Sequence, residues 1–314
     1  MANSDLPHWS AYWACGYITS LPQDFAGNYD GEIRAFWETG FAQAPHGARV
    51  LDLCTGNGAI ALLAVAWSRA HSPGLKVTAI DAAAIDPQKL LERHPRAAGL
   101  IREVQFIGNT AVETCSLPTA GFDLLTSQYG IEYCELEAAA RQVARLLAPG
   151  GRFIMLTHES SSDILSTMEG ERREYGLLDD LGLFRALADY LDGRRDEGAL
   201  IETLQAVRQG LAQQPGAPLL DTVVAMIEPM LSLDEGGLAA RSPQLRRSLM
   251  HLEHAQARLE DLLRVNRMIQ AEPAWYQVFE RHGLALRESG DLLYRGRHRS
   301  GHYYCFDKPL PERA

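Results

Sequence analysis

The residues best suited to bind a ligand lie in a turn between a buried strand and an apolar helix. The apolar run that starts at Val50 ends at Asp52, and Gly56 and Gly58 follow before a helix begins at about Ala59. Glycine lacks a Cβ, so the backbone can adopt positive φ and a ligand can lie directly against it. The helix directs its first amide groups at the same place. Such a turn normally holds a nucleotide or a nucleotide-like cofactor.

The spacing of this turn excludes two common nucleotide sites. A dinucleotide-binding turn has the pattern G-x-G-x-x-G, but Ile60 and Ala61 follow Gly58 and the third glycine is missing. A phosphate-binding loop ends in a Lys-Ser or Lys-Thr pair, which this turn lacks. The string D-L-C-T-G-N-G-A-I-A-L instead resembles the first motif of the class I S-adenosylmethionine-dependent methyltransferases, in which an acidic residue stands four positions before the first glycine.

This resemblance implies S-adenosylmethionine as the cofactor and S-adenosylhomocysteine as its product. Asp52 and Gly56 have the spacing of the family motif. The cofactor carries a cationic sulfonium and an ammonium group instead of a pyrophosphate, so a carboxylate at the strand end suits its charge. We therefore assign Asp52, Gly56 and Gly58 to cofactor binding.

Further candidates for cofactor binding follow the next two strands. Asp81 ends the apolar strand Leu75–Ile80, one strand-helix-strand unit after the glycine turn, where it can accept hydrogen bonds from two ribose hydroxyls. The third predicted strand, Val104–Ile107, is followed by Asn109 and Thr110. Relatives in this family often have an acid here that contacts the adenine amino group, and the side-chain carbonyl of Asn109 can accept the same bond.

Two later stretches match the family's motifs in the expected order. Gly121–Gly130 forms the fourth strand and its exit, which faces the methyl group in such folds. We therefore assign Ser127 and Gln128 to the cofactor and Tyr129 to the acceptor. The Pro-Gly-Gly turn within Leu146–Gly151 introduces the fifth strand, as it does in these methyltransferases.

The first 47 residues are dense in aromatic side chains. Apolar residues at helical spacing predict a helix over residues 30–41, most of whose rings pack in the core. In similar methyltransferases, the segment before the first motif forms a lid over the cofactor and the acceptor. The candidates for contact with the acceptor are Tyr12, Trp13, Tyr17 and Tyr29.

A long helical stretch follows the fifth strand, where this family normally has one helix and an antiparallel strand pair. One amphipathic helix is expected over Leu200–Leu211, ending before Pro215-Gly216. Ser242-Pro243 predicts the N-cap and first residue of another helix that runs to about Met268. The alternatives for this insertion are a cap over the acceptor and the surface of a homodimer.

Two histidines of the insertion, His251 and His254, lie three residues apart on the second of these helices. A metal site would need further ligands, and no third ligand is identifiable in the sequence. We therefore expect solvated surface histidines and assign no metal.

The expected fold class is α/β, a doubly wound sheet of seven strands that is mostly parallel and ends in an antiparallel pair, as the family resemblance implies. An α-helical insertion follows strand five. The domains would be an aromatic lid segment at 1–47, a cofactor-binding domain at 48–159 and 273–314, and a helical insertion at 160–272.

Composition restricts the partners that this chain can have. Acidic residues number 40 against 30 lysines and arginines, and the net charge of −10 opposes binding to nucleic acid. The compact basic run Arg295–Arg299 is too short to follow a phosphate backbone. The five cysteines form no C-x-x-C pair, and neither a signal peptide nor a membrane span is evident. We expect a cytoplasmic protein without a membrane partner.

The predicted function is methyl transfer from S-adenosylmethionine to an oxygen or nitrogen atom of a small-molecule acceptor. His158, just after the fifth strand, is the candidate general base, with a helix-cap or packing role as the alternative. Glu132 and Tyr133 are further candidates. Carboxyl or aminopropyl transfer and a catalytically silent cofactor-binding protein remain alternatives, and the sequence leaves the acceptor and its methylated atom open.

Overall fold

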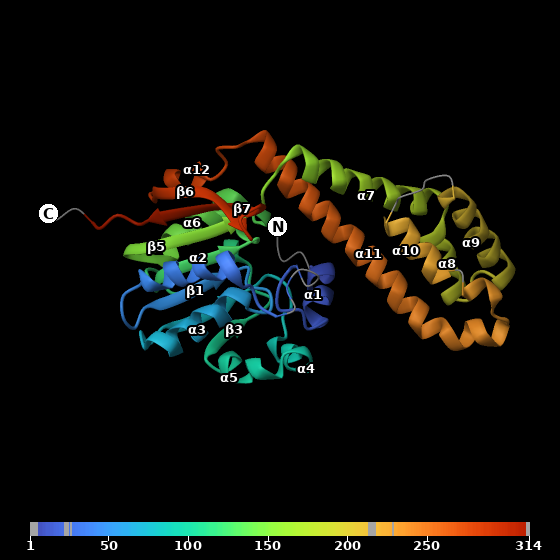
Figure 1. The fold of residues 1–314 in the computed structure, drawn as a ribbon, viewed down its shortest axis with the longest axis horizontal. Coiled ribbons are helices and arrows are strands. Elements are labelled where there is room, and N and C mark those ends of the chain that lie inside the picture. Colours follow the sequence, from blue (N-terminus) through green and yellow to red (C-terminus); the bar gives the residue numbers. More distant parts are fainter. Residues whose placement is uncertain (1–5, 22–24, 26, 213–217, 228, 312–314) are drawn as a thin grey trace. The chain divides into compact units, whose positions relative to one another are not determined.

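The chain forms two compact units in a computed structural model (Figure 1). Unit 1 comprises Met1–Ser160 and Val265–Ala314, and unit 2 comprises Ser161–Arg264. The residues that the structure describes are 6–21, 25, 27–212, 218–227 and 229–311.

Unit 1 is built on a sheet of seven strands in the order β3-β2-β1-β4-β5-β7-β6. The strands are β1 (Arg49–Leu53), β2 (Lys76–Ile80), β3 (Val104–Ile107), β4 (Phe122–Gln128), β5 (Leu147–Thr157), β6 (Ala285–Tyr294) and β7 (His298–Asp307). The first five run parallel, and β7 pairs antiparallel with both β5 and β6 at one edge. This arrangement confirms the predicted fold class.

The central strands are short apolar runs because helices cover both faces of the sheet. Val50 of β1 pairs with Val77 of β2 and with Leu124 of β4, and all three side chains are buried. Since β1 to β5 are parallel, their carboxyl ends meet at one edge. This edge collects Asp52, Asp81 and the residues that follow β3, β4 and β5.

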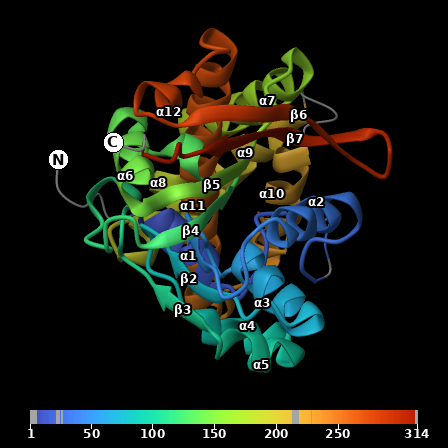
Figure 2. The same cartoon turned by 90° about the vertical axis from the view of Figure 1, so that its left-hand side faces the viewer.

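Helices pack on the two faces of this sheet in separate groups (Figure 2). Residues of α2, α3 and α5 join one apolar core, and residues of α6 and α12 join the other. The helices of unit 1 are α1 (Pro7–Ala14), α2 (Gly31–Ala42), α3 (Ala59–His71), α4 (Leu90–Arg93), α5 (Ala98–Ile101), α6 (Leu136–Leu146) and α12 (Gln277–Arg281).

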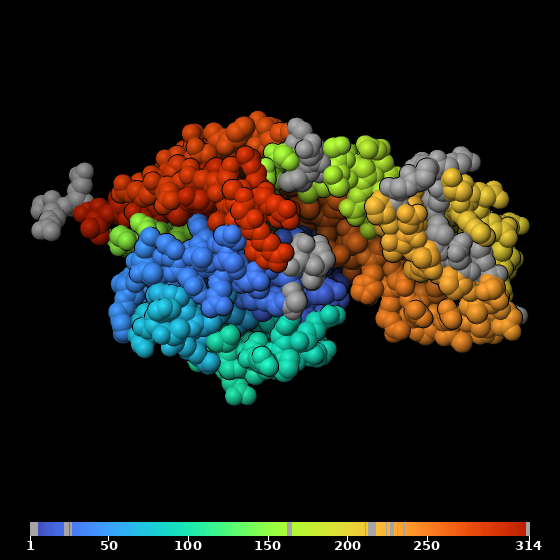
Figure 3. Space-filling view, viewed as in Figure 1, coloured from blue at the N-terminus to red at the C-terminus, as the bar shows by residue number. Residues whose placement is uncertain are grey.

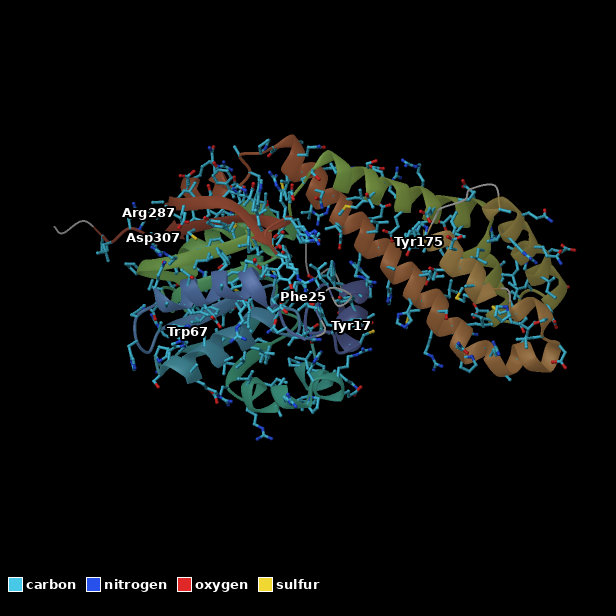
Figure 4. The ribbon with its side chains drawn as sticks, in the orientation of Figure 1. Tyr17, Phe25, Trp67, Tyr175, Arg287 and Asp307 are labelled. Atoms are coloured by element: carbon cyan, nitrogen blue, oxygen red, sulfur yellow. The ribbon has the colours of Figure 1, made fainter. Side chains whose placement is uncertain are left out.

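The β6–β7 hairpin closes one edge of the sheet and meets the N-terminal part of unit 1, as the space-filling view shows (Figure 3). The Tyr294 hydroxyl donates to Asp30, and the Arg295 amide donates to Glu32 at 3.1 Å. At the other end of the hairpin, Asp307 accepts from Arg287 at 3.1 Å (Figure 4). The first two bonds attach the turn of the hairpin to the segment at the start of α2, and the third joins β6 to β7.

Among its described residues, unit 2 contains helices and no strands, and it has its own apolar core, in which Tyr175 is buried. Its helices are α7 (Ser162–Asp180), α8 (Leu183–Leu191), α9 (Glu197–Leu211), α10 (Pro218–Ile227) and α11 (Glu235–Ala271), whose residues from Val265 onward belong to unit 1. The predicted stop at Pro215-Gly216 lies outside the described residues. Among those residues, no helix is long and apolar enough to span a membrane.

The predicted start of α11 at Ser242-Pro243 is wrong. The helix begins at Glu235, because the Asp234 side chain accepts from the Gly237 amide at 2.8 Å and caps it. Pro243 therefore lies inside the helix, where it lacks one amide donor. The buried side chains of Leu238 and Leu245 lie on either side of it, so apolar packing offsets that loss.

Candidate functional site

The glycine turn after β1 has the strained backbone that its sequence predicts. Gly56 has φ 54° and Gly58 has φ 92°, both in the left-handed region that favours glycine. The side chain of Asp52 stabilises the turn through hydrogen bonds. Its two carboxylate oxygens accept from the hydroxyls of Thr55 at 2.5 Å and Thr126 at 2.8 Å. Burial raises the pKa of Asp52 to about 6.

Asp81 joins three of the predicted cofactor-binding segments. Its Oδ2 accepts from the Gly56 amide at 2.7 Å, and its Oδ1 accepts from the Ala83 amide at 2.8 Å. Its carbonyl accepts from the Thr110 amide at 2.7 Å, and the Asn109 amide donates to Ala83 at 3.0 Å. The turns after β1, β2 and β3 thus form one hydrogen-bonded unit, in which burial raises the pKa of Asp81 to about 6.

These groups fit S-adenosylmethionine. A carboxylate offers about four lone-pair positions, so Asp81 keeps acceptor capacity for ribose hydroxyls beside its two backbone donors. The carbonyl oxygen Oδ1 of Asn57, between the two glycines, is buried and has no donor among the described residues. An unpartnered buried acceptor suits a ligand that brings N–H donors, such as the ammonium group of this cofactor.

The aromatic segment, defined as Leu6–Leu21, packs directly on the glycine turn. A Cβ at Gly56 would lie 2.4 Å from the Trp13 ring, and a Cβ at Gly58 would lie 2.5 Å from the Phe106 ring. The side-chain nitrogen Nδ2 of Asn57 donates to the main-chain carbonyls of Trp13 and Tyr17 at 2.8 Å each. Trp13 therefore lies against the cofactor turn.

Tyr12 and Tyr17 belong to the same aromatic segment. The Tyr12 ring lies 4.9 Å from the Trp13 ring and 5.1 Å from the Tyr17 ring, centroid to centroid. Tyr17, which is labelled in Figure 4, also has the guanidinium of Arg93 over its ring, 4.7 Å from the ring centroid. These contacts fix both tyrosines to unit 1 beside the turn.

The exit of β4 brings together the other predicted residues. Ser127 is fully buried, and its hydroxyl accepts from the Ile131 amide at 3.1 Å. Gln128 accepts from the Trp37 indole at 2.5 Å. The Tyr129 ring lies 6.4 Å from that of Tyr29, which is buried. Ser127 and Gln128 thus shape the strand exit.

Backbone strain gathers at this edge of the sheet. Cys54, Asn109 and Tyr129 follow the ends of β1, β3 and β4, and their φ values are 54°, 51° and 53°. Positive φ is uncommon for residues other than glycine and recurs at functional sites. The strain therefore marks the same edge that the motifs predict.

His158 lies at the carboxyl end of β5 and is paired with a buried acid. Oε1 of Glu132 accepts from Nδ1 of His158 at 2.8 Å and from the main-chain amide of His158 at 3.0 Å. The Glu132 side chain has no exposed surface, whereas that of His158 is 23% exposed. The imidazole is thus held on one side and reachable from solvent.

A row of aromatic rings connects His158 to the glycine turn. The Tyr133 ring lies 5.7 Å from that of His158, the Trp9 ring lies 5.8 Å from that of Tyr133, and Trp9 stacks on Trp13 at 6.4 Å. On its other side, His158 packs against Tyr129 at 4.8 Å. The rings of Trp13, Trp9, Tyr133 and Tyr129 thus form one aromatic wall. The candidate cofactor turn and the candidate base both lie against it.

Three contributors to this site have no clear signal in the sequence. Asn57 contacts the aromatic segment through hydrogen bonds that span about forty positions. Trp9 is one of many N-terminal aromatics. The pairing of Glu132 with His158 depends on the sheet order, because it joins residues that follow the carboxyl ends of two strands adjacent in space. Among the described residues, no three potential metal ligands cluster.

Comparisons with known proteins show what this chain is similar to. The chain is 34% identical over 109 residues to the demethylmenaquinone methyltransferase of Thermus thermophilus, covering 34% of this chain and 46% of that protein. It is 34% identical over 110 residues to a ubiquinone/menaquinone biosynthesis C-methyltransferase of Nitrobacter hamburgensis, covering 34% and 41%. The chain thus spans less than half the length of these two relatives.

Among solved structures, a TehB-like SAM-dependent methyltransferase of Corynebacterium glutamicum aligns over 96% of this chain and 97% of its own, with 15% identity and a TM-score of 0.40. The family described as a methyltransferase domain matches residues 25–206, more than half of the chain. The match confirms the methyltransferase family that the motifs predict. The chain belongs to the methyltransferase-domain family.

Proposed function

We propose that this enzyme methylates an oxygen or nitrogen atom of a small-molecule acceptor, with His158 as the general base. The observation that carries this proposal is the imidazole at the carboxyl end of β5, joined to the glycine turn by the aromatic wall. Imidazole exchanges protons near neutral pH, so it suits an acceptor that must lose a proton.

S-adenosylmethionine supplies a methyl group that its sulfonium has already activated, so alignment provides much of the rate and a base serves only a protonated acceptor. Asp81 and the turn at Gly56 and Gly58 would hold this cofactor, with Asn109 and Thr110 beside them. Asp52 and Ser127 would act by keeping the strand exits in shape, since their side-chain oxygens are engaged within the fold. Gln128 accepts from the Trp37 indole, while its buried Nε2 has no acceptor among the described residues and is left for the cofactor.

The aromatic side chains predicted to contact the acceptor favour a small molecule. Tyr12, Trp13, Tyr17, Tyr29 and Tyr129 bring rings and few charges to the edge of the sheet, as sites for small ligands usually do. The net charge of −10 disfavours nucleic acid. Both curated relatives are named for quinones, which are small molecules.

Carbon methylation is the second candidate, because one relative is named a C-methyltransferase. In that reaction, a base would remove a proton from the methylated carbon or from a hydroxyl that activates it. The same imidazole could serve, so the methylated atom must be identified directly.

The test uses S-adenosylmethionine labelled in its methyl group, with RNA, protein and a metabolite fraction below about 1 kDa as separate acceptors. Label should enter the metabolite fraction, and NMR of the product should show an O- or N-methyl group. His158→Ala should lower turnover by about 10²- to 10⁴-fold without weakening cofactor binding. His46→Ala, at the opposite edge of the sheet, is the matched control.

Three results would contradict the proposal. If the label is found chiefly in RNA or in protein, the acceptor is that macromolecule and not a small molecule. A C-methyl product would select the second candidate. If His158→Ala turns over at the wild-type rate, His158 is not the general base.

A further inference from the structure

Glu132 is buried at the tight turn that follows β4. The turn is fixed by the bond from the Ile131 amide to Ser127 and by the bond from the Tyr133 amide to the Gly130 carbonyl at 3.0 Å. β4 and β5 are adjacent and parallel, so this turn lies beside the end of β5. The fold thus brings Glu132 to His158 although 26 positions separate them in the sequence.

The hydrogen bonds of Glu132 serve one residue. Oε1 accepts both the Nδ1 proton and the main-chain amide of His158, at 2.8 and 3.0 Å. Oε2 is buried and has no donor among the described residues. A buried carboxylate is costly unless it is well paired, so one retained only for the fold would be expected to use both oxygens. A functional role accounts for its position.

From this geometry we infer that Glu132 is a positioning residue that fixes the tautomer and orientation of His158; the inference rests on the proposed function. A carboxylate oxygen can only accept, so Nδ1 must carry the proton. In the neutral ring, Nε2 then has the free lone pair. That nitrogen is the atom that can receive a proton from the acceptor.

The aromatic neighbours restrict the same ring. Tyr129 and Tyr133 contact the imidazole at 4.8 and 5.7 Å, with planes inclined by 40° and 72°. The Tyr129 hydroxyl is itself bound to the Ser300 carbonyl. Packing therefore limits rotation of the imidazole, while Glu132 determines which nitrogen is protonated.

The O–H or N–H proton of the acceptor passes to Nε2 of His158 while the acceptor atom forms a bond to the methyl carbon. The methyl–sulfur bond breaks, and its electron pair stays on sulfur as a thioether. The imidazolium that results lies next to the Glu132 carboxylate, which stabilises the positive charge. The proton is then released to water.

Three variants test this inference. Glu132→Gln keeps the size of the side chain but removes its charge, and Glu132→Asp keeps the charge on a shorter chain. Glu135→Gln, on an exposed acid that caps α6, is the matched control. Circular dichroism and calorimetry with S-adenosylhomocysteine show whether each variant is folded and binds ligand.

The first readout needs no acceptor. In protein labelled with ¹⁵N-histidine, at about pH 8.5 where imidazoles are neutral, the His158 signal should show a proton on Nδ1. His158→Gln identifies this signal among the ten histidines. Glu132→Gln loses the charge and can turn either its oxygen or its NH₂ group toward Nδ1, so both tautomers should be seen, whereas Glu132→Asp and Glu135→Gln should keep the wild-type tautomer.

The second readout is turnover on the metabolite fraction. Glu132→Gln should lower kcat by on the order of 10²-fold and leave KM and the affinity for S-adenosylhomocysteine nearly unchanged. Glu132→Asp should recover part of kcat. If Glu132→Gln keeps both the wild-type tautomer and the wild-type kcat, the inference is overturned. It is equally overturned if every loss follows unfolding and the tautomer never changes.

The two readouts also separate this inference from the proposed function. If His158→Ala keeps full turnover, the base assignment fails and the positioning role in catalysis fails with it, whatever the tautomer. If His158→Ala is inactive but Glu132→Gln is not, His158 remains the base and Glu132 is not its positioning residue.

Discussion

Replacing Gly56 with alanine should destabilise unit 1 and abolish cofactor binding, for two reasons that can be separated. Gly56 has φ 54°, where a residue with a Cβ costs about 1–2 kcal/mol. The new Cβ would also lie 2.4 Å from the Trp13 ring, about 1 Å closer than the 3.4 Å at which ordinary contact begins. Trp13 is only 8% exposed, so it cannot move freely. Overpacking of this kind adds about 1–3 kcal/mol.

Gly47→Ala is the matched control for the first of these costs. Gly47 has φ 74°, yet a Cβ there would meet no atom within 4 Å. Its loss of unfolding free energy should therefore be about 1–2 kcal/mol, against about 2–5 kcal/mol for Gly56→Ala. The double variant Gly56→Ala/Trp13→Ala should show a coupling of about 1–3 kcal/mol, because the overlap disappears with the ring.

Urea unfolding measures these free energies, and calorimetry with S-adenosylhomocysteine measures the affinity. Equal losses for Gly56→Ala and Gly47→Ala, together with no coupling to Trp13, would refute the packing of the aromatic segment on the glycine turn. Undiminished affinity of Gly56→Ala would show that the cofactor does not approach this turn.

Asp81→Asn should weaken S-adenosylmethionine binding by about 1–3 kcal/mol. Burial raises the pKa of Asp81 to about 6, so the affinity of the wild type should increase between about pH 5 and pH 7 as this carboxyl ionises. The affinity of the variant should change less over this range, and equal pH profiles of affinity would contradict the role of Asp81. Asn57→Asp removes both side-chain N–H donors to the aromatic segment, so limited proteolysis should cleave this segment faster. Unchanged cleavage would show that these two hydrogen bonds do not hold the segment in place. The bonds from Arg152 and Arg287 lower the pKa of Asp307, so Asp307→Asn should cost about 1 kcal/mol near neutral pH and progressively less in acid, a difference that thermal unfolding would detect or refute.

The sheet was predictable because its determinants are local. A glycine turn, an acid at the end of the second strand and a Pro-Gly-Gly turn each constrain a short stretch of backbone, and the family resemblance supplies their order. The helices that follow Asp30 and Gly58 have apolar residues at helical spacing, which α2 and α3 place in the core.

Contacts between distant segments were less predictable. Pro243 resembles the first residue of a helix. The helix nevertheless begins before it, because Asp234 caps the helix and its buried apolar residues already start at Leu238. The bonds from Asn57 to the aromatic segment depend on tertiary structure, because an asparagine between two glycines is equally typical of a plain turn. The pairing of Glu132 with His158 depends on strand adjacency, which becomes known only with the sheet order.

Titration calorimetry with S-adenosylmethionine tests the central claim most directly, because it asks whether the edge formed by the glycine turn and Asp81 is a cofactor site. S-adenosylmethionine and S-adenosylhomocysteine should both bind to wild type below about 1 mM, which corresponds to more than about 4 kcal/mol of binding free energy. Binding should weaken in Asp81→Asn, and NAD should give no heat of binding. Binding of NAD together with failure of both S-adenosyl compounds would contradict the account.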